Sequence, residues 1–322
     1  MSVQSRIFVA NEDIQVAASL QADRQIVLTV SPAHAPLPAP FDRPEDAYNF
    51  EWAWMDARTV AGNPRNLEVH WYPVFGTLLR ACVCRILGCM VIQQPIVWSI
   101  SVDPNPDNLP LDKTLHLPQR QLSSVEPDLT VALRLPPPGP GVIGTAMHPL
   151  LGEWKRAIPR GLTHLGGVPR GYRAINLLGQ KLSLAKAQVE AQACELFAQQ
   201  TFWPEDRRQS QVILLAGAGG WFTAAVMDRD TYEGTDMRAV RLGFRPMDTD
   251  DVEEAGAVPD DLDVQPVRHD KLFEGFLWLP TLCGDDAWSK PVLLGTADAL
   301  EMILWIKRCL HSFATTDPHI IV

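Results

Sequence analysis

The order of apolar segments in the middle of this chain constrains its fold more than any other feature. Residues 125–135 are rich in Val, Leu and Thr and alternate in part, which predicts a strand, and residues 150–158 form a second short strand-like segment. A Pro/Gly-rich stretch, residues 136–149, separates the two. Residues 182–202 then carry strong helix formers with an apolar face of Leu184, Ala187, Ala191, Cys194 and Phe197.

Two more strand-like segments follow this helix. Residues 211–216 and 221–227 are joined through Gly217, Gly219 and Gly220, which predicts a hairpin. The glycines are not followed by Gly-Lys-Ser/Thr, so a phosphate-binding loop is disfavoured. Strand, strand, helix and strand in this order predict an α/β fold with a central mixed sheet flanked by helices.

The flanking segments divide the chain into three parts. Residues 67–87 have helical periodicity, with Pro73 in the first turn and Gly88 as a stop signal, and residues 96–102 resemble a strand. We therefore expect a core over residues 67–228. Residues 1–66 form an N-terminal extension that contains a weak strand at 25–30 and a proline-rich connector at 31–44. Residues 229–322 hold an acidic loop at 248–263 and a helix at 297–313.

Composition narrows the possible classes of protein. The chain has 322 residues, 46% hydrophobic and 20% charged, which is ordinary for a globular protein. Its net charge of −10 argues against a surface coated with positive charge, although a local basic groove is compatible with it. The six cysteines lack zinc-site spacing, and neither a secretory leader nor an unbroken membrane segment is evident. We expect a soluble, intracellular protein, cytoplasmic or nuclear.

Three charged residues carry the most informative chemistry. Asp128 follows Pro127 at the head of one predicted strand, and Glu153 and Lys155 lie two apart on the next, so that they share a face. If these strands are neighbours, two carboxylates and an ammonium converge. Such a set can hold Mg²⁺ or Mn²⁺ through oxygen ligands and can serve phosphodiester hydrolysis.

This pattern resembles the PD-(D/E)XK, or restriction-endonuclease-like, nuclease superfamily. Pro127-Asp128 matches the first half of its motif and Glu153-Trp154-Lys155 the second, and the likeness covers residues 67–227. It implies a restriction-endonuclease-like core. Asp128, Glu153 and the Trp154 carbonyl would bind metal, and Lys155 would lie beside the attacking water. The family pattern also nominates Glu68 on the first helix as a metal ligand and Gln188, with Gln192 four residues on, as a catalytic residue on the following helix.

A basic segment supports a nucleic-acid partner. Residues 154–189 carry seven basic residues and no acidic residue. Beyond Lys155, we expect these to contact phosphates: Arg156, Arg160, Arg170, Arg173, Lys181 and Lys186. No membrane partner is expected, and a homodimer that cuts both strands is compatible with the family.

Plainer interpretations remain beside these. Asp128 could cap a turn, Glu153 and Lys155 could be an exposed strand pair, and Glu68 could interact with a helix dipole. Gln188 could be an ordinary surface residue, and the basic residues could neutralise the acidic loop. The main alternative function is an inactive nuclease-fold scaffold that binds nucleic acid or protein. A third is a small-molecule enzyme with a pocket built from Trp52, Trp54 and Trp71.

Overall fold

The structure is a computed structural model. It describes residues 40–95, 97–100, 122–134, 146–164, 167–203, 205, 208–233, 272–273, 276, 278 and 281–316. The predicted strand at 25–30, most of the proline-rich connector and the acidic loop at 248–263 lie outside this range.

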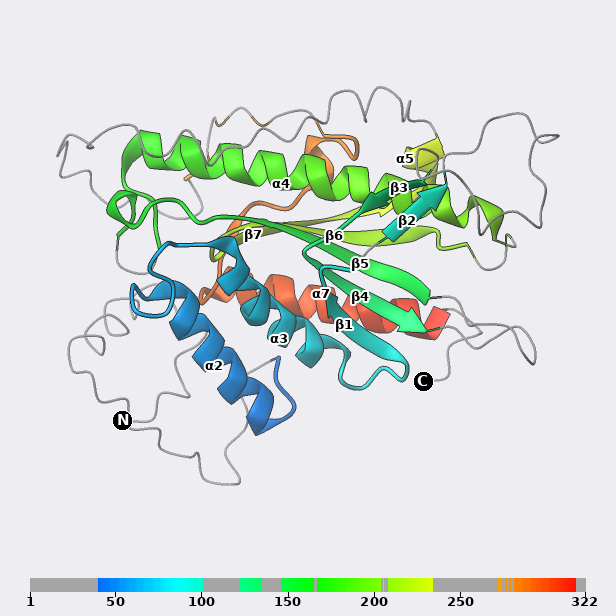
Figure 1. Cartoon of the computed structure of the whole chain (residues 1–322), viewed down its shortest axis with the longest axis horizontal. Coiled ribbons are helices and arrows are strands. Elements are labelled where there is room, and N and C mark those ends of the chain that lie inside the picture. The colour runs from blue at the N-terminus through cyan, green and yellow to red at the C-terminus, as the bar shows by residue number, and fades with distance from the viewer. Residues whose placement is uncertain are drawn as a thin grey trace.

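A six-stranded mixed sheet forms the centre of the described residues (Figure 1). Its order is β1 (Cys89–Gln93), β4 (Leu129–Arg134), β5 (Ala146–Lys155), β6 (Gln211–Ala218), β7 (Trp221–Asp228) and β8 (Val292–Leu293). The β5–β6 pair is parallel, whereas the other neighbours are antiparallel. The predicted α/β class, with a mixed sheet flanked by helices, is therefore confirmed.

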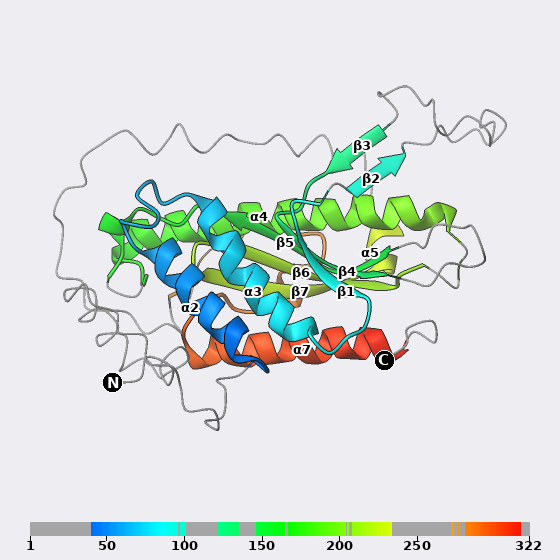
Figure 2. The same cartoon turned by 60° about the horizontal axis from the view of Figure 1, so that its bottom comes forward.

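Helices cover both faces of this sheet (Figure 2). The long helix α4 (Gly171–Gln199) packs on one face, while α2 (Pro44–Arg58), α3 (Tyr72–Val83) and α7 (Ala297–Thr316) form a layer on the other. Along β6, Val212 and Leu214 pack with α4, and Ile213 and Leu215 pack with the opposite layer. A central strand buried on both sides needs apolar residues throughout, which explains the unbroken run in β6.

Several segments differ from the sequence expectations in the first half of the chain. The helix predicted at 67–87 starts as a 3-10 turn, η3 (Glu68–Trp71), and α3 ends at Val83. Residues 89–93 form β1, which the sequence interpretation missed. The strand predicted at 96–102 is β2 (Val97–Ile100), which pairs with β3 (Leu122–Val125) in a separate two-stranded sheet. The strand predicted at 125–135 corresponds to β4, which starts at Leu129, so Asp128 lies just before it, and β3 ends at Val125.

The later elements agree better in kind than in extent. Strand β5 starts four residues before the expected position, and α4 starts at Gly171 instead of residue 182. The hairpin of β6 and β7 is as predicted, and Gly219 in its turn has a φ of +60°, where glycine is favoured. Helix α2, inside the predicted N-terminal extension, was not expected. Short elements complete the described chain: η7 (Arg160–Leu162), η8 (Gln200–Phe202), α5 (Arg229–Glu233) and η12 (Asp285–Ala287).

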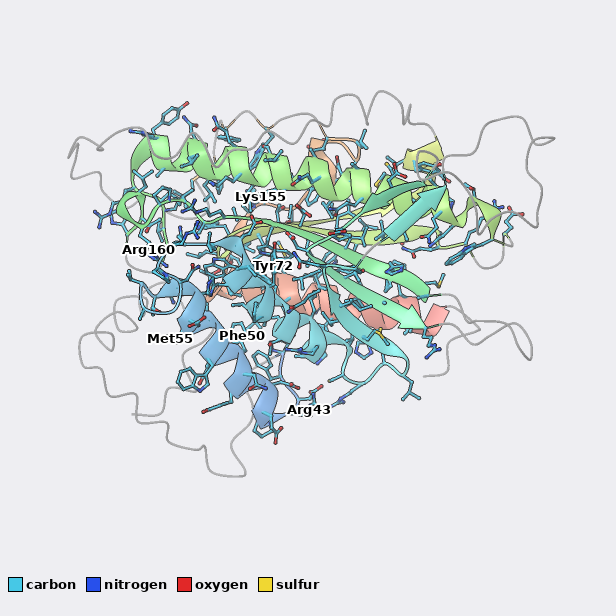
Figure 3. The ribbon with its side chains drawn as sticks, viewed as in Figure 1. Arg43, Phe50, Met55, Tyr72, Lys155 and Arg160 are labelled. Atoms are coloured by element: carbon cyan, nitrogen blue, oxygen red, sulfur yellow. The ribbon has the colours of Figure 1, made fainter. Side chains whose placement is uncertain are left out.

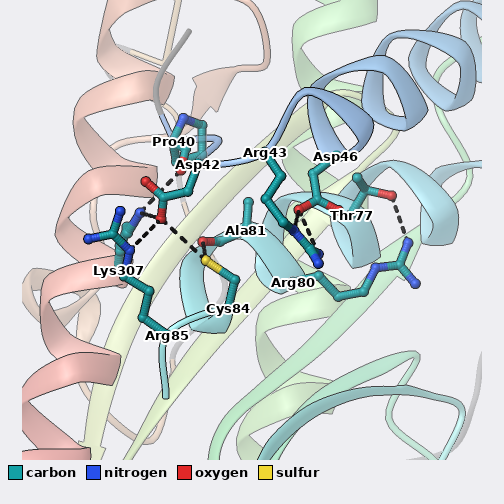
Figure 4. A network of polar contacts seen from close by, with 10 residues as sticks. All are labelled: Pro40, Asp42, Arg43, Asp46, Thr77, Arg80, Ala81, Cys84, Arg85 and Lys307. Atoms are coloured by element: carbon teal, nitrogen blue, oxygen red, sulfur yellow. Dashed lines mark hydrogen bonds and ion pairs between the residues drawn. The ribbon is translucent and has the colours of Figure 1, made fainter. Parts of the chain in front are cut away.

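Polar contacts tie the α2–α3–α7 layer together (Figure 4). Asp42, just before α2, lies 3.3 Å from Lys307 of α7 and 3.2 Å from Arg85 after α3. Each such surface pair contributes about 0–1 kcal/mol, so the apolar core dominates and the polar contacts refine the packing. The layer matters for function because it fixes the start of α3 at one end of the sheet. None of the helices in the described chain has the length and apolarity needed to cross a bilayer.

Candidate functional site

The side chain of Trp154 fixes the orientation of β5. It is fully buried and packs on Phe75 of α3, with ring centroids 4.3 Å apart. Gly152 and Gly217 make room for it, since a Cβ at Gly217 would lie 2.2 Å from the indole Nε1. Because side chains alternate along a strand, Trp154 faces the α3 layer and Glu153 and Lys155 face α4.

Asp128 lies beside this part of β5. Strands β4 and β5 pair Leu129 with Gly152, and continuing that antiparallel register places Asp128 opposite Glu153. The backbone N–H of Trp154 donates to Asp128 Oδ2 at 2.6 Å, and the hydroxyl of Tyr72, at the start of α3, donates to Oδ1 at 2.7 Å. Asp128 is therefore held from two elements at once.

Glu153 is held from both sides as well. Lys155 Nζ donates to Glu153 Oε1 at 2.7 Å, and Gln192 Nε2 of α4 donates to Oε2 at 2.9 Å. Glu153 is buried and Lys155 is half-buried. The structure thus brings the three predicted side chains together. We call Asp128, Glu153, Lys155, Tyr72 and Gln192 the carboxylate cluster, and Figure 3 labels two of its members, Tyr72 and Lys155.

The electrostatics of the cluster are unbalanced. Burial, and then the charge of Glu153, raise the pKa of Asp128 to about 7. Burial, and then the charge of Asp128, raise the pKa of the Tyr72 hydroxyl, so Tyr72 stays a hydrogen-bond donor. Two buried carboxylates share one ammonium, and the cluster therefore favours a further positive charge.

The helix residues nominated by family resemblance have mixed placements. Glu68 lies in η3, and the Tyr72 hydroxyl is 3.5 Å from Glu68 Oε1, so it reaches the edge of the cluster through Tyr72. Gln192, rather than Gln188, contacts Glu153, because Gln192 lies one turn further along α4. Tyr72 escaped the sequence interpretation. Its spacing of four residues from Glu68 places the two on one helical face, which is the signal that could have found it.

The donor set fits a hard divalent cation. Each carboxylate oxygen can accept more than one contact, and Mg²⁺ is typically bound by one or two protein carboxylates together with water and substrate oxygens. In an extended strand the N–H and C=O of one residue point to the same side, so the Trp154 carbonyl faces the side of Asp128. Within the part of the chain that is described, no three His, Cys, Asp or Glu side chains gather as a metal site. The fit thus rests on two carboxylates and a backbone oxygen.

The four arginines among the predicted phosphate-binding residues differ in their contacts. Arg170 and Arg173 are exposed at the start of α4. Arg156 Nη2 donates to the Arg65 carbonyl at 2.6 Å, and Arg160 Nη2 donates to the carbonyls of Thr59 and Asn63, so these two also tie β5 to the loop after α2.

The two lysines of α4 are buried instead. Lys181 and Lys186 are 7% and 4% exposed. The ammonium of Lys186 lies 4.1 Å from the ring centroid of Trp278 and 5.1 Å from that of Trp288. Packing on aromatic faces occupies Lys186, and burial removes both lysines from the surface that a phosphate backbone reaches. The predicted contact of Lys181 and Lys186 with phosphates therefore does not fit their burial.

Comparisons of the chain with protein-family models, with curated proteins and with solved structures found no match.

Proposed function

We propose that this chain is a metal-dependent nuclease with a restriction-endonuclease-like core, cutting phosphodiester bonds with Mg²⁺ or Mn²⁺. One observation carries the proposal. The backbone N–H of Trp154 donates to Asp128, and the two residues that flank Trp154 in sequence, Glu153 and Lys155, form an ion pair beside the Asp128 carboxylate. This arrangement supports the proposal because it brings the Pro-Asp and Glu-x-Lys residues to one place.

The cation would be held by Asp128, Glu153 and the Trp154 carbonyl. When bound, it supplies charge that polarises the phosphate and lowers the pKa of a water molecule. The Lys155 ammonium has three N–H donors and donates one hydrogen bond to Glu153. The other two donors can orient the attacking water and stabilise negative charge on the phosphate.

Other residues of the cluster position the carboxylates. Tyr72 fixes one oxygen of Asp128, and Gln192 fixes one oxygen of Glu153. Arg156, Arg170 and Arg173 would contact the nucleic-acid backbone near the end of β5 and the start of α4. We propose further that the protein acts inside the cell, in the cytoplasm or nucleus, and cutting of both strands would suit a homodimer.

A scaffold without turnover is the second candidate, and one observation favours it. Every carboxylate oxygen of Asp128 and Glu153 already accepts a hydrogen bond from the protein. Such a network can persist without a cation, and the net charge of −10 weakens general affinity for nucleic acid.

Cleavage assays separate the two candidates. We expect purified protein with Mg²⁺ or Mn²⁺ to cut DNA or RNA, and Asp128→Asn, Glu153→Gln and Lys155→Met each to lower the rate about 10³-fold or more. The matched control is Glu126→Gln, an exposed carboxylate two residues before Asp128, which should leave the rate unchanged. Circular dichroism must show folded variants. Absence of cleavage of every substrate by the wild type would refute the enzyme and leave the scaffold.

A further inference from the structure

A second site lies just beyond the end of β5. It is a pocket of about 740 Å³, within the range of small-molecule sites. The pocket is lined by the end of α2 and its following loop, by residues within 157–164 and 167–170, by the β6–β7 turn and by residues 293–294. Figure 3 labels Met55 and Arg160, which belong to two of its walls. No carboxylate-cluster residue lines it.

The charge of the lining is one-sided. Arg58, Arg160 and Arg170 line the pocket, and none of its described lining residues is Asp or Glu. In a chain of net charge −10, this concentration of cations without acids is unusual. The Arg160 bonds to carbonyls use only Nη2, and a guanidinium carries five N–H donors. The lining therefore matches an anionic ligand such as a phosphate monoester.

Aromatic surface accompanies the charge. Trp54, Trp71 and Trp221 line the pocket, and Arg58 lies 4.8 Å over the Trp54 ring. Trp71 is 5% exposed and contributes ring surface to the pocket wall. Flat rings beside arginines fit a nucleobase next to a phosphate.

Residues that neighbour the carboxylate cluster in sequence form part of the pocket wall. Trp71 precedes Tyr72, and Ala157 follows Lys155 by two residues, about 7 Å along an extended chain. Asn66 holds this junction, since its Nδ2 donates to the carbonyls of Ala157 and Ile158 at 3.1 and 3.0 Å. A strand whose phosphodiester lies at the cluster would have a neighbouring nucleotide within reach of the pocket.

We propose that the tryptophan- and arginine-lined pocket beyond β5 binds one nucleoside monophosphate unit, the terminal nucleotide of a strand whose backbone passes the carboxylate cluster. Its placement on a strand rests on the proposed nuclease function. Binding of the nucleotide itself does not, because no metal and no cleavage enter into it.

The test is calorimetric titration of the full chain in EDTA with dAMP, and with deoxyadenosine as the probe that lacks phosphate. We expect saturable binding of dAMP, weaker binding of deoxyadenosine, and about tenfold weaker dAMP binding in Arg170→Glu, the loss expected for one charge-assisted hydrogen bond. Arg308→Glu is the control for the charge reversal, because Arg308 is exposed on α7 and does not line the pocket. It should bind dAMP like the wild type.

No saturable binding of dAMP, or equal weakening in Arg170→Glu and Arg308→Glu, would overturn the proposal. An oligonucleotide with a 5′- or 3′-terminal phosphate should displace dAMP. If neither displaces it, the occupant is a free nucleotide and the placement on a strand is wrong. Asp128→Asn should bind dAMP normally, so loss of cleavage and loss of the pocket are distinguishable.

Discussion

Two groups of buried charges lie along α4, and they are built differently. The first is the carboxylate cluster, which α4 reaches through Gln192. The second, which we call the latch, consists of Lys186, Glu190, Trp278 and Trp288. Glu190 is 1% exposed, and its two oxygens accept bonds from the N–H groups of Leu282 and Cys283 and from Trp288 Nε1.

The difference lies in charge balance. In the latch, three fixed donors satisfy one carboxylate, and the Lys186 ammonium lies against two indole rings. In the carboxylate cluster, burial, and then the nearby charge of Glu153, raise the pKa of Asp128 to about 7. A buried carboxylate whose hydrogen bonds are all made holds a segment against the fold. Two neighbouring buried carboxylates with one ammonium lower the stability and favour binding of a cation.

The largest expected effect is loss of the latch. Glu190→Ala should lower the free energy of unfolding by about 3–5 kcal/mol, because it leaves three buried or half-buried donors without their acceptor. Denaturant unfolding followed by circular dichroism measures this. Glu301→Ala, on the exposed face of α7, is the matched control and should change stability by no more than about 0.5 kcal/mol. Equal changes in the free energy of unfolding for the two substitutions would show that the Glu190 hydrogen bonds do not stabilise the fold.

A smaller effect of opposite sign is expected at Asp128. Its folded pKa is raised from 3.8 to about 7, so the stability tied to its proton is fully present below pH 4 and is lost as pH rises through 7. In metal-free buffer, Asp128→Asn should therefore stabilise the protein at pH 8 by about 2 kcal/mol and have little effect at pH 4. Denaturant unfolding at several pH values checks this. A constant difference between wild type and variant across that range would contradict the unbalanced pair, and Glu126→Gln should show no pH-dependent difference.

The smallest effect is stabilisation by metal. At ten times its Kd, Mg²⁺ should stabilise the wild type by about 1.4 kcal/mol at pH 8, seen as a rise in Tm. The rise should vanish in Asp128→Asn and persist in Glu190→Gln, since the latch does not bind the ion. A rise of equal size in all three proteins would mean that Mg²⁺ binds elsewhere.

Local spacing predicted which residues of the candidate site share a face of a strand, but it did not predict which residues from other elements contact them. Residues two apart on a strand share a face, which made Glu153 and Lys155 predictable as a pair with Trp154 opposite. Tyr72 lies 56 positions from Asp128, and its contact depends on how α3 packs at the end of the sheet. The choice of Gln192 over Gln188 depends on where α4 crosses β5. The burial of Lys186 depends on tryptophans about a hundred residues away.

Apolar periodicity by itself determined the α/β class, the β6–β7 hairpin and the long helix between β5 and β6. Periodicity reports which side of an element is buried, and these elements are long or strongly patterned. The tertiary structure decided that β1 joins the sheet beside β4 while β2 and β3 stand apart, that two carboxylates from separate strands share one buried space, and that arginines from α2, η7 and the start of α4 line one pocket. Those outcomes depend on long-range packing and desolvation, which no local pattern encodes.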